Sequence, residues 1–170
     1  MEIIDAIKTR RSIRKFLDQA VKKNLLLELV NCGIWAPSAG NMQTWRFVIV
    51  TDPNQIHKIK NLSPGIFDKP QGIIVVCSDF DEAVEKSGLQ GEHFAVIDAA
   101  MAAENILLAA HDKGLGACVI GSFHQLALQR LLNLPSNIRP ILLIILGFPA
   151  EVPKPPKRKF EEIVWWETYK

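Results

Sequence analysis

The chain has 170 residues, of which 48% are hydrophobic and 22% charged. This length and composition predict a single domain over residues 1–170 with one substantial core. The 20 Lys and Arg residues nearly balance the 18 Asp and Glu residues, for a net charge of +2, which excludes the broad basic surface of a nucleic-acid-binding protein.

The first half of the chain predicts helices that alternate with strands. Apolar residues recur at helical spacing in two segments, and two short β-branched runs bounded by turn residues indicate buried strands. The first helix brings Arg10 to its C-terminal end, and the second ends at Pro37. The predicted elements are helices over residues 2–9 and 22–35, strands at 47–50 and 73–76, and a helix from 52 to about 60.

The second half begins with a polar segment, residues 79–92, whose periodicity is weak. We expect a mobile surface segment there, with a possible helix. The following segment, 93–111, is rich in Ala and Leu on all sides, so we expect a helix buried nearly throughout. A glycine turn at 114–116 leads into a short strand, and a helix near 125–132 and a strand at 141–146 follow. Helices mixed with four or five short strands indicate an α+β fold.

The cysteines and the apolar segments bear on the compartment. Cys32, Cys77 and Cys118 are far apart in apolar stretches, which argues against a disulfide framework or a metal site and favours buried thiols in a reducing compartment. The apolar stretch 94–110 is interrupted by charged and amide side chains, and the N-terminus lacks the pattern of a signal peptide. We therefore expect a cytoplasmic protein without a membrane span.

Residues 10–15, Arg-Arg-Ser-Ile-Arg-Lys, form a basic segment that combines four cations with a hydroxyl group. This set suits an anion that needs bidentate donors and a hydroxyl contact, such as a phosphate monoester. The alternative is a solvated charged face, which is the commoner meaning of a basic run.

Residues 36–45, Ala-Pro-Ser-Ala-Gly-Asn-Met-Gln-Thr-Trp, are expected to form a loop. Pro, Ser, Gly and Asn favour a non-regular backbone, and the amides can read the donor and acceptor edge of a heterocycle. By itself, the same sequence also fits an ordinary turn.

In this order and spacing, the basic segment and the loop resemble the nitroreductase-like family of FMN-dependent oxidoreductases. That family has an R-x-S-x-R segment followed by P-S-x-x-N-x-Q-P-W, and Thr44 stands where proline is usual. Residues 114–123 match the family pattern G-L-G-x-x-x-[IV]-G-[GS]-F, and residues 157–164 match basic residues followed by L-E-E-[IV]-V, with Lys159 where proline is frequent. The resemblance extends from residue 3 to residue 166.

The resemblance implies a fold and an assembly. The fold is nitroreductase-like, with a central, mostly antiparallel sheet of four to five strands packed between helices. The assembly is a homodimer with the long helix near the subunit seam. Each dimer would hold noncovalent FMN at the interface, with NADH or NADPH as the electron donor.

The resemblance also implies which cations hold the cofactor. Arg10 and Ser12 should contact the phosphate and the ribityl chain, with Arg11 beside them. Arg14 should lie beside the N1/C2=O edge of the flavin, where a fixed cation stabilises the reduced ring; a surface salt bridge is the alternative. The C-terminal candidates for the phosphate are Lys157, Lys159 and Arg158.

Two further groups of residues should approach the flavin ring. The loop, which the partner subunit can contribute in this family, supplies Pro37, Ser38, Asn41 and Gln43. The glycine-rich stretch supplies Val119, Ile120, Gly121 and Ser122, and Gly121 would let a backbone N–H reach flavin N5. Trp45 is expected in the core.

These residues predict an FMN oxidoreductase that takes hydride from NAD(P)H onto flavin N5. It would reduce a nitroaromatic, a quinone or a similar small-molecule acceptor by a ping-pong route, with no essential side-chain acid or nucleophile and no metal. The alternative is an FMN-binding storage or sensor module without efficient turnover. A nucleotide-binding regulator is disfavoured, because Val119 occupies the third glycine position of a dinucleotide fingerprint and the Lys of a P-loop is replaced by Ser122.

Overall fold

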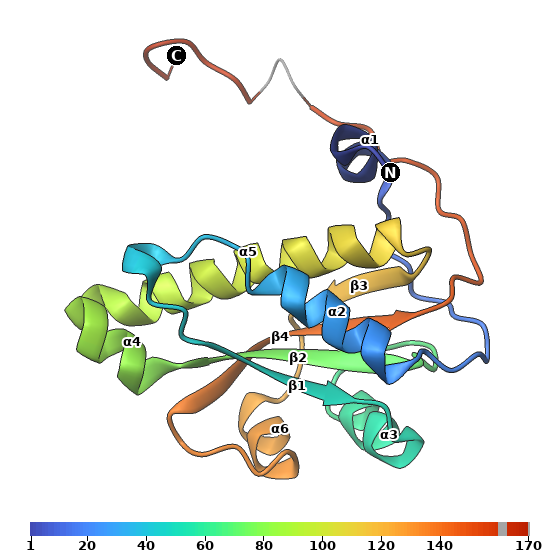
Figure 1. The fold of residues 1–170 in the computed structure, drawn as a ribbon, viewed down its shortest axis with the longest axis horizontal. Helices are drawn as coiled ribbons and strands as arrows, with labels where there is room; N and C mark the ends of the chain where they lie inside the picture. Colours follow the sequence, from blue (N-terminus) through green and yellow to red (C-terminus); the bar gives the residue numbers. More distant parts are fainter. Residues whose placement is uncertain (160–162, 170) are drawn as a thin grey trace.

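The computed structural model describes residues 1–159 and 163–169 (Figure 1). Each helix and strand expected from the sequence is present, with bounds that differ by a few residues. In chain order the elements are α1 (Ile3–Thr9), α2 (Lys23–Gly33), η1 (Ala39–Asn41), β1 (Trp45–Val50), α3 (Pro53–Asn61), β2 (Gly72–Asp79), α4 (Phe80–Ser87), η2 (Gly88–Gln90), α5 (Gly91–Asp112), β3 (Gly116–Ile120), α6 (Gln125–Leu131) and β4 (Ile138–Gly147).

The four strands form one antiparallel sheet in the order β1-β2-β4-β3, which confirms the expected sheet. Helices α2 and α5 lie on one face, and α3 and α6 lie on the other (Figure 1). Along β2, Ile73 and Val75 pack in the core cluster with α3 and α6, whereas Ile74 and Val76 pack in the cluster with α2 and α5. Because helices cover both faces, β2 reads as a continuous apolar run instead of an alternating one.

The long helix α5 has two different faces. Its alanines pack against the sheet and α2, but Val96, Ile97 and Met101 are 44%, 36% and 44% exposed. The expectation of burial nearly throughout is therefore wrong for a single chain. Residues 80–112 are long and apolar enough to match a membrane span by length and composition, yet α5 is a core helix of this fold.

The segment expected to be mobile, residues 79–92, forms helix α4 and the short turn η2. The Asp79 carboxylate accepts a hydrogen bond from the N–H of Glu82, which caps the start of α4. Phe80 and Ala83 are buried, and the guanidinium of Arg139 lies 4.4 Å above the Phe80 ring. A helix of only two turns leaves too few apolar positions for its periodicity to be recognised in the sequence.

The basic segment covers the free edge of the sheet. Ser12 forms a parallel bridge with Ala117 of β3, and the N–H of Ile13 donates to the carbonyl of Ala117 at 3.0 Å. A Cβ at Gly116 would lie 2.6 Å from the Ile13 side chain, so glycine is required for this close approach. The basic segment therefore begins alongside β3 and then lies against the residues that follow β4, where Phe16 bridges Pro149.

Candidate functional site

Arg10 and Arg11 line a cavity of about 250 Å³ together with His111 and Gly116. Arg10 Nε is 3.4 Å from Glu104 Oε1, but it is buried without a hydrogen-bond partner among the described residues. The Arg11 guanidinium donates to the carbonyls of Lys8 and Arg10 instead, at 2.8 and 2.6 Å. Arg10 is thus the better placed of the two cations to receive an anion.

His111 contributes little positive charge to this cavity near neutral pH. Burial and the charges of Arg10 and Arg11 lower the pKa of His111. Its Nε2 lies 2.9 Å from Thr9 Oγ1, a contact that ties the end of α1 to α5. We read this histidine as a structural residue.

Arg14 lies at a second, more open cavity of about 560 Å³. Its side chain is exposed and has no ion-pair partner in the part of the chain that the structure describes, which disfavours the surface salt bridge. The Glu151 carboxylate holds the backbone here, because its Oε1 accepts from the N–H groups of Arg14 and Lys15 at 2.7 and 3.2 Å. The residues that line this cavity are Ser12, Arg14, Lys15, Phe67, Asp68, Glu151 and Pro153.

The loop around η1 has an unusual backbone. Gly40, Asn41 and Gln43 have φ values of +54°, +56° and +53°, and each non-glycine residue at such an angle costs about 1–3 kcal/mol. Hydrogen bonds within the loop offset part of this cost: Gln43 N–H donates to Ser38 Oγ at 3.2 Å, and Gln43 Nε2 donates to Asn41 Oδ1 at 2.8 Å. The side chains of Pro37, Asn41 and Gln43 are exposed.

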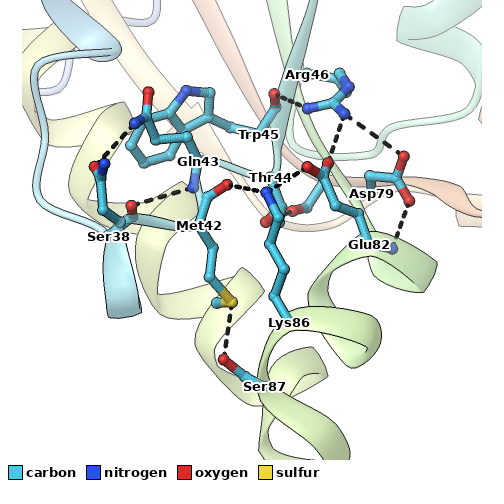
Figure 2. Close-up of polar contacts among 12 residues, drawn as sticks. Ser38, Met42, Gln43, Thr44, Trp45, Arg46, Asp79, Glu82, Lys86 and Ser87 are labelled. Carbon is cyan, nitrogen blue, oxygen red and sulfur yellow. Dashed lines mark hydrogen bonds and ion pairs between the residues drawn. The ribbon is translucent and has the colours of Figure 1, made fainter.

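Side chains of α4 and α5 form hydrogen bonds with the backbone of this loop. Asp98 of α5 accepts from the N–H of Ala39 with both carboxylate oxygens, at 3.1 and 3.2 Å. Lys86 of α4 donates to the carbonyl of Met42 at 3.0 Å, and Ser87 Oγ lies 3.0 Å from Met42 Sδ (Figure 2). The loop therefore has fixed points on both sides of Gly40 and Asn41.

Thr44, which replaces the usual proline of the resembled family, has its own role. Its Oγ1 lies 2.8 Å from Ser78 Oγ, and both side chains are buried. Its carbonyl accepts from the N–H of Asp79 at 2.8 Å. Trp45, next in sequence, is buried as expected.

At the end of β3, Val119 is half-buried, and Gly121 and Ser122 are exposed. The Ile120 side chain packs in the core, so a ligand could contact this residue only through its backbone. A Cβ at Gly121 would have no atom within 4 Å, and the Ser122 carbonyl is held by Ser63 Oγ at 2.8 Å. This is an open backbone position that a flat ligand could approach closely.

The basic C-terminal residues Lys157, Arg158 and Lys159 are exposed. Arg158 and Arg11 line one shallow cavity together with Ile7 and Lys8, so the tail passes the basic segment. Residues 160–162 of the matched tail pattern lie outside the described residues.

The candidate residues form two groups within one chain. The basic segment, β3 and the tail lie at one end of α5, where Thr9 contacts His111. The loop lies near its other end, at Asp98 (Figure 1). Asp98 and His111 are 13 residues apart, or about 20 Å of helix, and Glu104, which pairs with Arg10, lies between them.

The chemistry of these groups fits a flat cofactor that carries a phosphate. Arg10 offers a cation at one cavity and Ser12 a hydroxyl group at the other, both suited to an anion, and Gly121 offers an open backbone position. Asn41 and Gln43 present amides that can pair with a heterocycle. Sequence reasoning did not identify Glu151, Asp68 or Lys86, whose contacts here join residues far apart in the chain.

Comparisons with known proteins agree with this fold. The sequence profile of the Nitroreductase family matches residues 7–72 and 58–148. A Methanothermobacter thermautotrophicus protein named "Putative NADH dehydrogenase/NAD(P)H nitroreductase" is 38% identical over 160 residues, covering 90% of this chain and 80% of the relative. The Bacillus subtilis FMN reductase (NADPH) is 27% identical over 181 residues, covering 97% and 73%. The solved structure of B. megaterium NfrA1 superposes with a TM-score of 0.90 at 28% identity, covering 100% of this chain and 76% of that one.

Proposed function

The chain belongs to the nitroreductase family, and on that premise we propose that it is an FMN-dependent oxidoreductase that uses NADH or NADPH as its electron donor. The single observation that carries the proposal is the position of the basic segment along β3. This position brings Arg10 to one cavity and Ser12 and Arg14 to a second, beside the strand that ends at the open backbone of Gly121.

In this proposal each group of residues has a part in binding. Arg10 and Ser12 receive the phosphate, and Lys157 and Lys159 add charge from the tail, with Arg158 beside Arg11. Arg14 lies along the N1/C2=O edge of the ring, and the loop residues Pro37, Ser38, Asn41 and Gln43 complete the ring site. Bound FMN would accept hydride at N5 and deliver two electrons to a second substrate.

A homodimer is part of this proposal, and exposed apolar side chains support it. Exposed apolar side chains cluster on α1, α2 and α5, beyond what an isolated globular chain usually presents. In a dimer, the loop of one subunit would reach the cation-lined cavities of the other. The exposed side chains that we assign to the interface are Ile3, Ile4, Ile7, Leu27, Ile34, Trp35, Val96, Ile97 and Met101.

The acceptor is expected to be a nitroaromatic, a quinone or a similar small molecule, reduced by a ping-pong route. The acids beside Arg14, Glu151 and Asp68, accept hydrogen bonds from backbone N–H groups, and in this proposal water supplies the protons. We place the enzyme in the cytoplasm, because Cys77 and Cys118 are free, buried thiols and burial raises the pKa of Cys77 to about 12, as suits an inert thiol.

The cofactor assignment is tested by purifying the protein and identifying any flavin released by heat. We expect FMN at one per chain, because the cations close around a terminal phosphate and the chain has no fingerprint for an adenosine pyrophosphate. Flavin that chromatographs as FAD, or a colourless protein that takes up no FMN, would refute the assignment. Steady-state turnover with NADH or NADPH and a quinone then separates an oxidoreductase from a storage or sensor module, which would bind FMN without turnover.

A further inference from the structure

Asp98 is an unusual residue for its position. It is 3% exposed on the alanine-rich face of α5, between Ala95, Ala99 and Ala102, which are fully buried. A buried carboxylate is costly unless it is hydrogen-bonded, and burial raises the pKa of Asp98 while the bond from Ala39 opposes that rise. An alanine at position 98 would pack equally well on this face of α5.

The hydrogen bonds of Asp98 leave the helix and reach the loop. Both carboxylate oxygens accept from the backbone N–H of Ala39, directly before Gly40 and Asn41, two of the three loop residues of positive φ. The acid therefore fixes the entry to the strained turn.

Lys86 fixes the exit from the same turn. Its ammonium group donates to the carbonyl of Met42 at 3.0 Å and pairs with Glu82 at 2.6 Å (Figure 2). Met42 is itself buried. Only Gly40 and Asn41 lie between the residues held by Asp98 and Lys86, and Gln43 follows directly.

We propose that Asp98 and Lys86 act together as positioning residues, clamping Ala39 and Met42 so that the turn between them presents Asn41 and Gln43 to the flavin ring. This inference deepens the proposed function and rests on it. Asp98 is adjacent to Ile97, which is exposed on the face of α5 that we assign to the dimer interface. The same helix would therefore contact the partner subunit and hold the loop. Neither residue touches the cofactor; each acts through the loop backbone.

Hydrogen exchange tests the clamp itself, without any flavin. In the full-length protein, amide exchange of residues 38–43 should accelerate at least tenfold in Asp98→Ala and in Lys86→Met, because each variant removes one fixed point. Asp98→Asn keeps an acceptor for the Ala39 N–H and should stay within about threefold of the wild type. The matched control is Lys113→Met, which removes an ion pair with Glu28 at the other end of α5 and should leave the loop unchanged. Unaltered exchange of the loop in both Asp98→Ala and Lys86→Met would overturn the clamp.

A double-mutant cycle tests whether the clamp serves the flavin. FMN dissociation constants are measured for the wild type, Asp98→Ala, Asn41→Ala and the double variant. Each single change should weaken binding by roughly tenfold, and the double variant should be no weaker than Asn41→Ala alone within about threefold, because both changes remove the same contact. When Asp98→Ala is combined with Arg10→Gln, the two fold-changes in the FMN dissociation constant should instead multiply.

The outcomes separate the two proposals. Independent, multiplying effects of Asp98→Ala and Asn41→Ala, or an unchanged visible circular dichroism spectrum of FMN in Asp98→Ala, would refute the positioning role while leaving the proposed function intact. A wild-type protein that binds no FMN would refute the proposed function and the flavin role of the clamp together, whereas hydrogen exchange would still report whether Asp98 and Lys86 hold the loop. If Asp98→Ala fails to fold, the same double-mutant cycle is measured with Lys86→Met in its place.

Discussion

At the scale of single residues, Arg10 and Arg14 have distinct surroundings. Arg10 is half-buried between α1 and α5 with its Nε near Glu104, whereas Arg14 is exposed beside the open cavity that Ser12 and Phe67 also line. A cation beside the ring interacts more strongly with the reduced flavin, which carries more negative charge, than with the oxidised one. A cation on the phosphate does not distinguish the two states.

Arg14→Gln should therefore lower the midpoint potential of bound FMN by tens of millivolts, since about 30 mV corresponds to roughly 1.4 kcal/mol for two electrons and one charge-assisted contact is of that order. Arg10→Gln should weaken FMN binding and leave the potential nearly constant. Redox titration and FMN titration of both variants check this, with Lys58→Gln on α3 as a control. Matching effects in the two variants, or exchanged ones, would contradict these roles.

Thr44 and Ser78 make a buried hydroxyl pair beneath the loop. Thr44→Val should lower the free energy of unfolding by about 1–3 kcal/mol, because the Ser78 hydroxyl is left without its partner. The double change Thr44→Val with Ser78→Ala should cost less than the sum of the two single changes. Urea unfolding of the four proteins measures this coupling, and strictly additive costs would show that the pair contributes nothing.

At the scale of elements, the ion pairs of α4 give its stability a dependence on pH. The pKa of Glu82 lies below its ordinary value of 4.5. The hydrogen bond from Lys86 has the largest effect and lowers the pKa, burial opposes that change, and the contact with Arg46 lowers the pKa further. An acid whose pKa is lowered on folding stabilises the folded state fully above its unfolded pKa and loses that contribution as the pH falls through the folded pKa.

Glu82→Gln should therefore destabilise the protein at pH 7 and progressively less below about pH 4.5, where Glu82 itself becomes protonated. The measurement is the difference in thermal unfolding midpoint between the wild type and Glu82→Gln across this range. Asp81→Asn, at an exposed neighbouring position of α4, serves as the control. A difference that stayed constant from pH 7 to pH 3.5 would contradict the role of Glu82.

The elements also show what a sequence can predict. Helical spacing of apolar residues located α1 and α2, and β-branched runs bounded by turn residues located β1 and β2. Such local patterning is strong where burial in a layered core imposes it. It failed for α4, where the Asp79 cap and two buried side chains define a helix too short for a pattern. The prediction for α5 was wrong because a helix that is apolar on all sides has the same sequence pattern whether its second face packs against its own chain or against another chain.

For the candidate site, too, the sequence predicts some residues and not others. Motif order identified the basic segment, the loop and the glycine-rich stretch, since each is local in sequence. Glu151 and Asp68 could not be found, because they contact Arg14 and Phe16 across 137 and 52 residues. Asp98 is one of the charged side chains that interrupt the apolar stretch 94–110, but only the structure identifies its partner as the Ala39 N–H.

At the scale of the whole molecule, the proposal holds that a dimer completes the site. Met101→Glu, which places a charge on the exposed face of α5, should shift the protein toward monomer and reduce FMN occupancy in parallel. Leu126→Glu changes a side chain of similar exposure, 61%, on α6 at the opposite face of the sheet and should alter neither. Light scattering combined with flavin absorbance gives both quantities, and a monomer with full FMN occupancy would refute the shared site.

The central claim, that this chain is an FMN-dependent NAD(P)H oxidoreductase, is tested most directly by following flavin absorbance without oxygen. The purified yellow protein is mixed anaerobically with one equivalent of NADH or NADPH, and a quinone or nitroaromatic is then added. We expect the absorbance near 450 nm to bleach with at least one of the two donors and to return when the acceptor is added, over successive cycles. A flavin that keeps its colour with both donors, or that bleaches but is not reoxidised by any such acceptor, would contradict the claim and favour a storage or sensor module.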